Sequence, residues 1–283
     1  MGSTRPGLTV LGSLNLDLTC RVPRLPAPGE TLTGRTLQRT PGGKGANQAV
    51  AAARLGGAVT MLGAVGADDA GTTLRAALRT AGVDDTGVAT VEAPTGTAMI
   101  AVDDTGENQI IVVPGANDEV RVPAAGFGPD DAVLCQLEIP LSTVLAAADS
   151  GPDFFALNAA PAVPLPARLR DACDLIIVNE TEYAAIPDLD AAALVAVTYG
   201  ADGAELLAHG ERIARAESPA VDAVDSVGAG DAFCAALVLG LRRGLPYDAA
   251  LAAACAVGAY AVSSPGAQPA LPPLDQFLAP ASR

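Results

Sequence analysis

Short apolar runs alternate with helix-like stretches along most of the chain. Four to eight apolar residues bounded by Gly, Pro, Asn or Asp are typical of buried strands, and longer apolar-rich stretches are typical of helices. Strands are predicted at 8–12, 58–63, 131–136, 154–158, 174–178 and 194–198. Helices are predicted at 46–55, 69–81, 141–148, 232–241 and 249–262. From about residue 45 onward the two types alternate, which predicts an α/β fold with a parallel-rich central sheet and helices on both faces.

A second, smaller sheet is predicted from segments with little apolar content. Residues 15–19 alternate polar and apolar positions, so Asn15 and Asp17 face the same side of an extended segment. A Thr-rich piece at 30–37 also looks extended, and 98–102 and 109–113 form a hairpin around 104–107. These pieces predict a β-sheet lid over about 15–40 and 96–114, within a single domain of 1–283.

Polar side chains follow several of the predicted strands. In open α/β sheets, ligands bind beyond the carboxyl ends of the strands, so these side chains are expected to line one cleft. Any one of them alone is more often a structural cap than a ligand-binding group. The residues concerned are Asn15, Asp17, Glu138, Asn179, Glu182, Thr198, Gly200 and the loop before Asp231.

The stretch 224–233 places two glycines where an apolar helix begins. A helix N-terminus offers unpaired N–H groups and partial positive charge, which suit a phosphate or a developing oxyanion. Asp231 lies at this positive end. From this stretch alone, its carboxylate is either a helix cap or a base beside an anion site.

A second glycine-rich stretch, 41–45, leads directly into an Ala-rich helix ending at Gly56. It is not a P-loop, because Lys44 is followed by Gly45 and the upstream glycine is missing. The glycines at 228 and 230 are not a dinucleotide fingerprint either, because Phe233 occupies the third position. The stretch at 41–45 suits a polar ligand, and a plain loop-to-helix junction is the alternative.

Composition excludes several classes of function. The chain of 283 residues has 32 acidic and 17 basic residues, a net charge of −15, which argues against nucleic acid and anionic membranes as partners. The apolar runs at 232–241 and 249–262 are too short to span a membrane. The one histidine, His209, falls in a predicted hairpin turn, so neither a Ser-His-Asp triad nor a His-rich metal site is expected.

The cysteines and the N-terminus favour a cytoplasmic protein. Five cysteines are scattered without a C-x-x-C pair, which suggests packed, reduced thiols. Residues 1–7 are polar and short, and resemble no secretory leader.

The motifs together resemble the ribokinase-like carbohydrate kinase family over nearly the whole chain, from Leu8 to about Phe277. The resemblance implies ATP-dependent phosphorylation of a sugar's primary hydroxyl beneath a small β-sheet lid. The matching segments are 12–17, 28–31, 42–51, 136–138, 179–182 and 225–231.

The resemblance also implies roles for residues on the sugar side of the site. Asp231 is expected to be the base, and the amides of Gly228, Ala229 and Gly230 are expected to stabilise the transferring phosphoryl group. Lys44 is expected to contact sugar or nucleotide phosphate. Residues expected to bind sugar hydroxyls are Asn15, Asp17, Gly43, Asn47 and Glu138.

On the nucleotide side the resemblance implies ATP, Mg²⁺ and a monovalent cation, usually K⁺. Asn179 and Glu182 are expected to organise phosphate and Mg²⁺, mainly through water. The nucleotide loop is expected to contain Thr198, Gly200 and Gly203. The positions matching the monovalent-cation loops are Asp225, Val227, Ala261, Ser264 and Gly266.

Two features depart from the family's pattern. Ala270 stands where relatives commonly present a serine to the monovalent cation. Residues 183–197 are fewer than the helix and loop that relatives carry there, and Pro187 limits any helix.

Substrate and assembly follow from the same resemblance. The double glycine with Lys44 and Asn47 is closest to family members that phosphorylate D-ribose. The alternatives are a kinase of another sugar or of a nucleoside, and a non-catalytic sugar- or nucleotide-binding protein on this fold. Relatives often pair through the lid, so a homodimer is expected, with extended segments at 16–22 and 31–40 whose edges a partner could cover.

Overall fold

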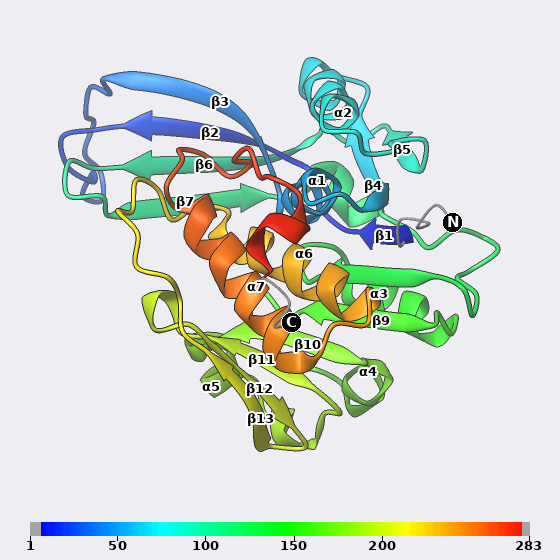
Figure 1. Ribbon diagram of the computed structural model, residues 1–283. Helices are drawn as coiled ribbons and strands as arrows, with labels where there is room; N and C mark the ends of the chain where they lie inside the picture. Colours follow the sequence, from blue (N-terminus) through cyan, green and yellow to red (C-terminus); the bar gives the residue numbers. More distant parts are fainter. Residues whose placement is uncertain (1–6, 279–283) are drawn as a thin grey trace.

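The computed structural model describes residues 7–278 and contains two β-sheets (Figure 1). The large sheet has nine strands in the order β13-β12-β11-β10-β9-β8-β1-β4-β5. Its strands in chain order are β1 (Gly7–Leu11), β4 (Ala58–Gly66), β5 (Val88–Val91), β8 (Ala132–Gln136), β9 (Phe154–Asn158), β10 (Leu175–Asn179), β11 (Val195–Thr198), β12 (Ala204–Ala208) and β13 (Glu211–Ala216). The first six residues, on which the expectation of no leader rests, lie outside the described part.

Seven neighbouring strands of the large sheet are parallel, from β11 across to β5. The sheet ends in an antiparallel hairpin of β12 and β13, which pairs with β11. His209 lies in the turn of this hairpin with a φ of 49° and an exposed side chain, as the sequence predicts. The predicted α/β class with a parallel-rich sheet is therefore confirmed.

Helices cover both faces of the large sheet because successive strand residues point to opposite sides. In β10, Leu175 and Ile177 pack into one apolar core, whereas Ile176 and Val178 pack into the other. The first core is covered by α1 (Lys44–Arg54), α2 (Asp69–Thr80), α6 (Ala229–Arg242) and α7 (Tyr247–Ala261), and the second by α3 (Leu141–Asp149), α4 (Ala167–Ala172) and the segment around α5 (Glu180–Ala185). No helix within residues 7–278 has the length and apolar character needed to cross a membrane.

The second sheet lies beside the large one, at the upper left of Figure 1. Its strand order is β3-β2-β6-β7, and β2 pairs in parallel with β6. The bounds are β2 (Asn15–Arg21), β3 (Thr36–Gly42), β6 (Gly96–Val102) and β7 (Asn108–Val113). The expected strand at 30–37 is largely wrong, because only its last two residues are in β3, which continues to Gly42.

Two predicted boundaries near the glycine motifs also change. Helix α6 begins at Ala229 rather than at residue 232, because Gly228 with a φ of 80° ends the preceding loop. Strand β3 continues through Gly42, so only Gly43 separates it from α1. Both changes bring backbone amides of a first helical turn next to a glycine.

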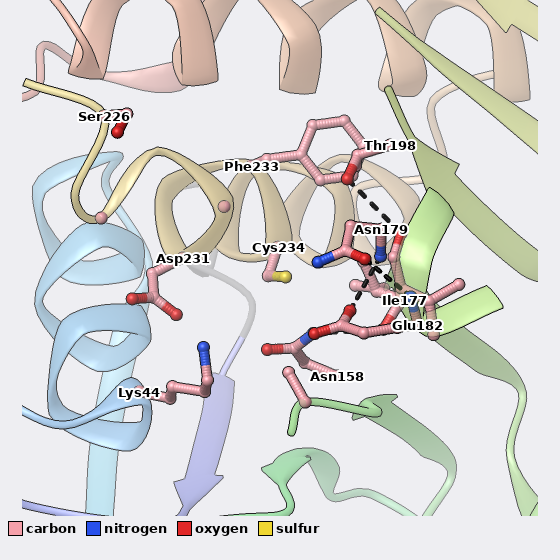
Figure 2. Close-up of a pocket in the computed structure, with 14 residues that line it drawn as sticks. Lys44, Asn158, Ile177, Asn179, Glu182, Thr198, Ser226, Asp231, Phe233 and Cys234 are labelled. Carbon is pink, nitrogen blue, oxygen red and sulfur yellow. Dashed lines mark hydrogen bonds between the residues drawn. The ribbon is translucent and has the colours of Figure 1, made fainter. Parts of the chain in front are cut away.

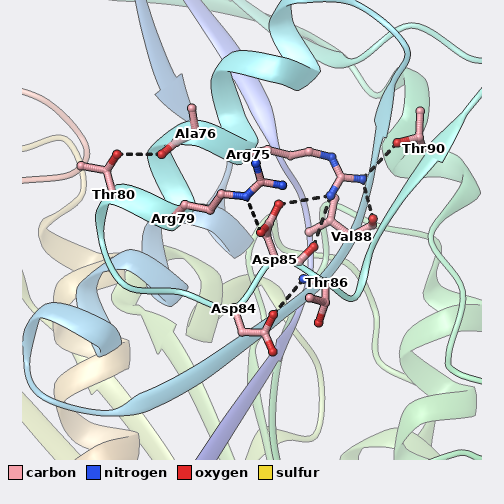
Figure 3. A network of polar contacts seen from close by, with 9 residues as sticks. All are labelled: Arg75, Ala76, Arg79, Thr80, Asp84, Asp85, Thr86, Val88 and Thr90. Carbon is pink, nitrogen blue, oxygen red and sulfur yellow. Dashed lines mark hydrogen bonds and ion pairs between the residues drawn. The ribbon is translucent and has the colours of Figure 1, made fainter.

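A buried ion pair fixes the edge of the large sheet (Figure 3). Asp85 accepts hydrogen bonds from Arg79 Nε at 2.8 Å and from Arg75 Nη1 at 3.2 Å. Arg75 also donates to the Val88 carbonyl at 2.5 Å and to Thr90 at 3.0 Å. The pair therefore joins α2 to β5, the last strand of the sheet.

Candidate active site

The N-terminus of α6 presents backbone N–H groups next to a glycine that no other residue can easily replace. The first bond of the i to i−4 type runs from Ala232 N to the Gly228 carbonyl at 2.9 Å, so the amides before Ala232 have no intrahelical partner. A Cβ atom at position 228 would lie 2.3 Å from the Ala267 carbonyl oxygen. Position 230 has open space instead. The Ala229 amide makes a long bond of 3.4 Å to the Ser226 carbonyl, and a helix end with amides of this kind suits an anion.

Asp231 lies in the first turn of α6 and does not cap it. Its Oδ2 accepts a hydrogen bond from Asn47 Nδ2 at 3.0 Å, and its Oδ1 accepts one from Gln48 Nε2 at 2.9 Å. Both donors belong to α1, and no side chain caps the N-terminus of α6. The cap interpretation of Asp231 is therefore wrong.

Burial changes the acidity of the Asp231 carboxyl group. Burial raises the pKa of the Asp231 carboxyl, and Glu138 raises it further, while Lys44 and the two α1 amides lower it. The net direction is upward. A carboxylate with a raised pKa is a better proton acceptor than an exposed one.

Lys44 and Glu138 lie beside Asp231. The Lys44 backbone N–H donates to Glu138 Oε2 at 3.0 Å, and Ser13 Oγ donates to the same oxygen at 2.6 Å. The Lys44 side chain points toward the Asp231 carboxylate (Figure 2). Burial alone would lower the pKa of the Lys44 amine, but Asp231 and Glu138 raise it overall, so the amine stays charged.

Asn15 and Asp17 project from β2, which approaches the first turn of α1. A Cβ atom on Gly43, whose φ is 87°, would lie 2.8 Å from the Asn15 backbone nitrogen. A Cβ atom on Gly42 would lie 2.1 Å from Asp17 Oδ2. Asn15 Oδ1 accepts a hydrogen bond from Asn117 Nδ2 at 2.8 Å, which fixes its amide. The two glycines therefore allow the polar side chains of β2 to approach α1 closely.

The carboxyl groups of Asp17, Glu138 and Asp231 lie close enough to affect one another's charge. Burial raises the pKa of Asp17 to about 7, and the negative charges of Glu138 and Asp231 contribute to the rise. Asp17 is therefore a proton-binding group near neutral pH. Three acidic side chains from β2, the end of β8 and α6 converge with one lysine.

Two cavities adjoin the α6 N-terminus. The smaller, of about 240 Å³, is lined by Lys44, Asp231, Asn158 and the carboxyl end of β10 (Figure 2). The larger, of about 610 Å³, lies between the β11–β12 connection and α7. They share the lining residues Thr198, Ser226, Gly230 and Phe233. Thr198, Gly200 and Gly203 all line the larger cavity, on the side predicted for a nucleotide.

Asn179 and Glu182 line the smaller cavity and also cap the N-terminus of α5. Glu182 Oε2 accepts from Asn179 N at 2.8 Å, and Asn179 Oδ1 accepts from Glu182 N at 2.8 Å, which is a capping box at the start of α5. Glu182 Oε1 and Asn179 Nδ2 have no hydrogen-bond partner among the described residues. One free carboxylate oxygen facing a polar cavity fits Mg²⁺ held mainly by water and phosphate.

The positions expected to hold a monovalent cation surround Asp225. Its Oδ1 accepts from Val227 N at 3.0 Å, and its Oδ2 accepts from Gly266 N at 2.9 Å. The Ala261 carbonyl accepts from Ser264 N at 3.2 Å. The structure thus brings the loops at 225–227 and 261–266 together, and their carbonyl and carboxylate oxygens fit a large monovalent cation.

The family model for pfkB family carbohydrate kinases matches residues 6–274. The chain belongs to this family. It is 37% identical to a ribokinase from Haemophilus influenzae, covering 97% of this chain and 98% of that protein. It is also 37% identical to a ribokinase from Bacillus subtilis, covering 94% and 96%. A structure of Arabidopsis thaliana ribokinase complexed with ribose and ATP superposes with a TM-score of 0.85 at 31% identity, covering 97% and 98%.

Sequence reasoning gave no role to a set of buried or half-buried polar residues in this carbohydrate kinase. None carries a local signal comparable to a glycine motif, although Asn158 ends a strand as Glu138 and Asn179 do. Gln48 interrupts an Ala-rich helix, which is the one indication that it has a polar partner in the core. The set consists of Ser13, Gln48, Asn117, Gln136, Asn158 and Gln268.

Proposed function

We propose that this carbohydrate kinase is a ribokinase, which transfers the γ-phosphoryl group of ATP to the 5-hydroxyl of D-ribose and releases ADP. The observation that supports it most directly is the buried Asp231 carboxylate in the first turn of α6, beside backbone amides that have no intrahelical partner. The relatives named ribokinase and the Arabidopsis complex with ribose and ATP support the choice of substrates.

Asp231 acts as the general base in this proposal. Its carboxylate takes the proton of the sugar hydroxyl, whose oxygen then forms a bond to the γ-phosphorus as the bond to the ADP oxygen breaks. The amides of Gly228, Ala229 and Gly230 stabilise the charge on the transferring group. Lys44, which points toward Asp231, adds positive charge at the same place (Figure 2).

Sugar hydroxyls are bound by side chains of β2, α1 and the end of β8. Asp17 and Glu138 accept hydrogen bonds from hydroxyls, and the amides of Asn15 and Asn47 donate and accept. Gly43 lets the sugar approach the backbone at the start of α1.

The nucleotide occupies the larger cavity, with Thr198, Gly200 and Gly203 along its loop. Its phosphates extend along the shared wall toward Lys44 and the α6 N-terminus. When bound, Mg²⁺ neutralises phosphate charge, and Glu182 and Asn179 face it mainly through water.

A monovalent cation such as K⁺ is bound by the loops around Asp225. Val227, Ala261, Ser264 and Gly266 supply its other oxygens from the backbone. Ala270 has no hydroxyl to add, so K⁺ is bound by fewer groups than in relatives with serine there.

The protein assembles as a homodimer through the small sheet and works in the cytoplasm. Edge strand β7 exposes apolar side chains on both faces, including Ile110 and Ile111 at 54% and 62% exposure. Unpaired edges with apolar side chains favour pairing with another chain. All five cysteines are free thiols, which is typical of a reducing compartment.

The test is ADP release with ATP, Mg²⁺ and K⁺ in the presence of D-ribose, 2-deoxyribose, fructose, adenosine or no acceptor. We expect the highest kcat/KM with D-ribose. Higher turnover with another acceptor would agree with the proposed mechanism but would show that D-ribose is not the preferred substrate. Ribose binding without turnover on any acceptor would contradict the kinase proposal and favour a binding protein.

A further inference from the structure

Gln48 touches Asp231 from inside the protein. Its side chain is fully buried, whereas Asn47, the other donor to Asp231, is 7% exposed. Gln48 also lies outside both cavities. Because its side chain has no exposed surface, contact with a substrate does not account for a glutamine at this position.

The direction of the Gln48 amide is fixed by three strands of the large sheet. The Ile177 carbonyl of β10 can only accept, and Asn158 Nδ2 donates to it at 3.1 Å. Asn158 must therefore present its oxygen to Gln48, whose Nε2 donates to it at 3.0 Å. The second hydrogen of the same Nε2 is donated to Asp231.

Gln136 of β8 completes this arrangement. Its Nε2 donates to Gln48 Oε1 at 2.5 Å, which keeps that oxygen turned away from Asp231. If the Gln48 amide were reversed, its oxygen would face the oxygens of Asp231 and Asn158. The polarity of the Gln48 amide is therefore determined by Asn158 and Asp231, and the donor of Gln136 complements it.

This chain of amides leaves one buried oxygen without a hydrogen-bond partner. Gln136 is fully buried, and its Oε1 has no hydrogen-bond partner among the described residues. Gly12 makes room for it, because a Cβ atom there would lie 1.9 Å from that oxygen. An unpartnered buried oxygen destabilises a fold, and an apolar side chain would avoid this cost.

We propose that Gln48 is a positioning residue that holds the Asp231 carboxylate in the orientation required for proton transfer, and that Gln136 orients Gln48. The inference rests on Asp231 being the base in the proposed reaction. The hydrogen bond from Gln48 occupies Oδ1 and restricts rotation of the carboxylate about its Cβ–Cγ bond. Oδ2, which also accepts a hydrogen bond from Asn47, is then the oxygen presented to the sugar hydroxyl.

Charged and titratable groups face Asp231 from four elements: Lys44 of α1, Glu138 after β8, Asp17 of β2 and Cys234 of α6. None of them forms a hydrogen bond with the Gln48 side chain, whose partners are Asn158, Asp231 and Gln136. Donation by Gln48 lowers the pKa of Asp231 against the effect of burial. Loss of this donor should therefore raise that pKa and move the acid limb of the kcat profile to higher pH.

The experiment compares Gln48→Met, Gln136→Met and the double variant. Methionine has similar volume and cannot donate a hydrogen bond. Thr143→Val is the control, because it removes another buried hydrogen bond, from Thr143 Oγ1 to the Val120 carbonyl at 2.8 Å, which does not involve Gln48, Gln136 or Asp231. For each protein, kcat and KM for ribose are measured across pH together with the Tm, and the Asp231 carboxyl is titrated by ¹³C NMR.

We expect Gln48→Met to lower kcat roughly 10- to 100-fold, part of the 10²–10⁴ contributed by a positioned base, with little change in KM. Gln136→Met should act in the same direction but less, and the double variant should be no worse than Gln48→Met, because both act through one group. Thr143→Val should lower the Tm and leave the acid limb in place.

Normal kcat and an unchanged Asp231 titration in Gln48→Met would overturn the inference, as would independent, additive effects of the two substitutions. Asp231→Asn in the same series separates this result from failure of the proposed function. A rate lost in Asp231→Asn but retained in Gln48→Met rejects only the role of Gln48. A rate retained in both rejects the base. The NMR titration tests the Gln48–Asp231 bond even if no acceptor is turned over.

Discussion

Asn47 and Asp231, 184 positions apart in the sequence, are joined by a hydrogen bond of 3.0 Å from the Asn47 amide to the Asp231 carboxylate. Gln268 Nε2 donates to Asn47 Oδ1 at 3.1 Å and so fixes which end of the Asn47 amide faces Asp231. A residue of the glycine-rich N-terminal motif, the carboxylate of the C-terminal motif and the loop near the proposed cation site thus form one unit.

Asp231→Asn should remove the base while preserving the shape of the site. We expect kcat to fall about 10²- to 10⁴-fold, because an amide cannot take the proton of the hydroxyl. Ribose binding, measured by calorimetry, should change little, since Asn15 and Glu138 remain. A variant that retains most of its rate would exclude Asp231 as the base.

Asp17→Asn should weaken ribose binding and make the free enzyme more stable at alkaline pH. The folded state keeps the Asp17 proton up to about pH 7, while the ordinary value is 3.8, so the folded state binds more protons in between. Stability should therefore fall as pH rises from about 4 to 7 in the wild type, an effect the Asn variant lacks. Melting curves at several pH values check this.

The same substitution separates stability from binding. Ribose affinity of the wild type should rise as Asp17 ionises near pH 7, because a carboxylate accepts stronger hydrogen bonds from hydroxyls. The Asn variant should bind more weakly with no such rise. Equal pH dependence in both proteins would show that another group is responsible.

Gly228→Ala should impair the anion site through the backbone. The added Cβ would lie 2.3 Å from the Ala267 carbonyl, so α6 or the loop must shift and the amides with it. Gly244→Ala is the matched control, because its φ of 75° is similar and nothing lies within 4 Å. The control should lose about 1–2 kcal/mol of stability and keep its kcat, whereas Gly228→Ala should lose both. Equal kcat values would contradict the role of these amides.

Asp85→Ala should destabilise the edge of the large sheet. Its side chain is 7% exposed, and its loss leaves Arg75 without its carboxylate. We expect the free energy of unfolding, measured by urea denaturation, to fall by about 3 kcal/mol, which is the usual effect of removing one partner of a buried ion pair. Asp104→Ala, which breaks an ion pair with Arg35 in which the Asp104 side chain is 51% exposed, should cost less than about 1 kcal/mol. Similar losses would show that burial does not determine the difference.

Ile111→Lys should separate the proposed dimer into monomers. A charged side chain at the apolar edge of β7 disfavours pairing with a second copy. Ile213→Lys is the control, because Ile213 is 42% exposed on β13, an edge strand of the other sheet. Light scattering should give half the wild-type mass for Ile111→Lys alone. A monomeric wild type would contradict the dimer.

Much of the fold could be predicted from the sequence because it depends on local periodicity. The apolar run at 174–178 had to be a strand buried on both faces, and the structure places alternate members, such as Ile176 and Ile177, in different cores. The turn at His209 follows from short-range backbone preferences, and so does the presence of a helix after Gly228, although it begins at Ala229 rather than at residue 232. The motifs at 42–51 and 225–231 likewise indicated a polar, anion-binding site.

Only the tertiary structure decided what the polar residues do. Asp231 can be a cap or a base in sequence, and its bonds to α1 exclude the cap. Asn179 and Glu182 turn out to cap each other's backbone while facing the cavity. Gln48 gave no clear signal, because the direction of an amide depends on partners in β8, β9 and β10 that are distant along the chain. Local sequence determines elements, whereas hydrogen-bond direction is determined by which elements meet.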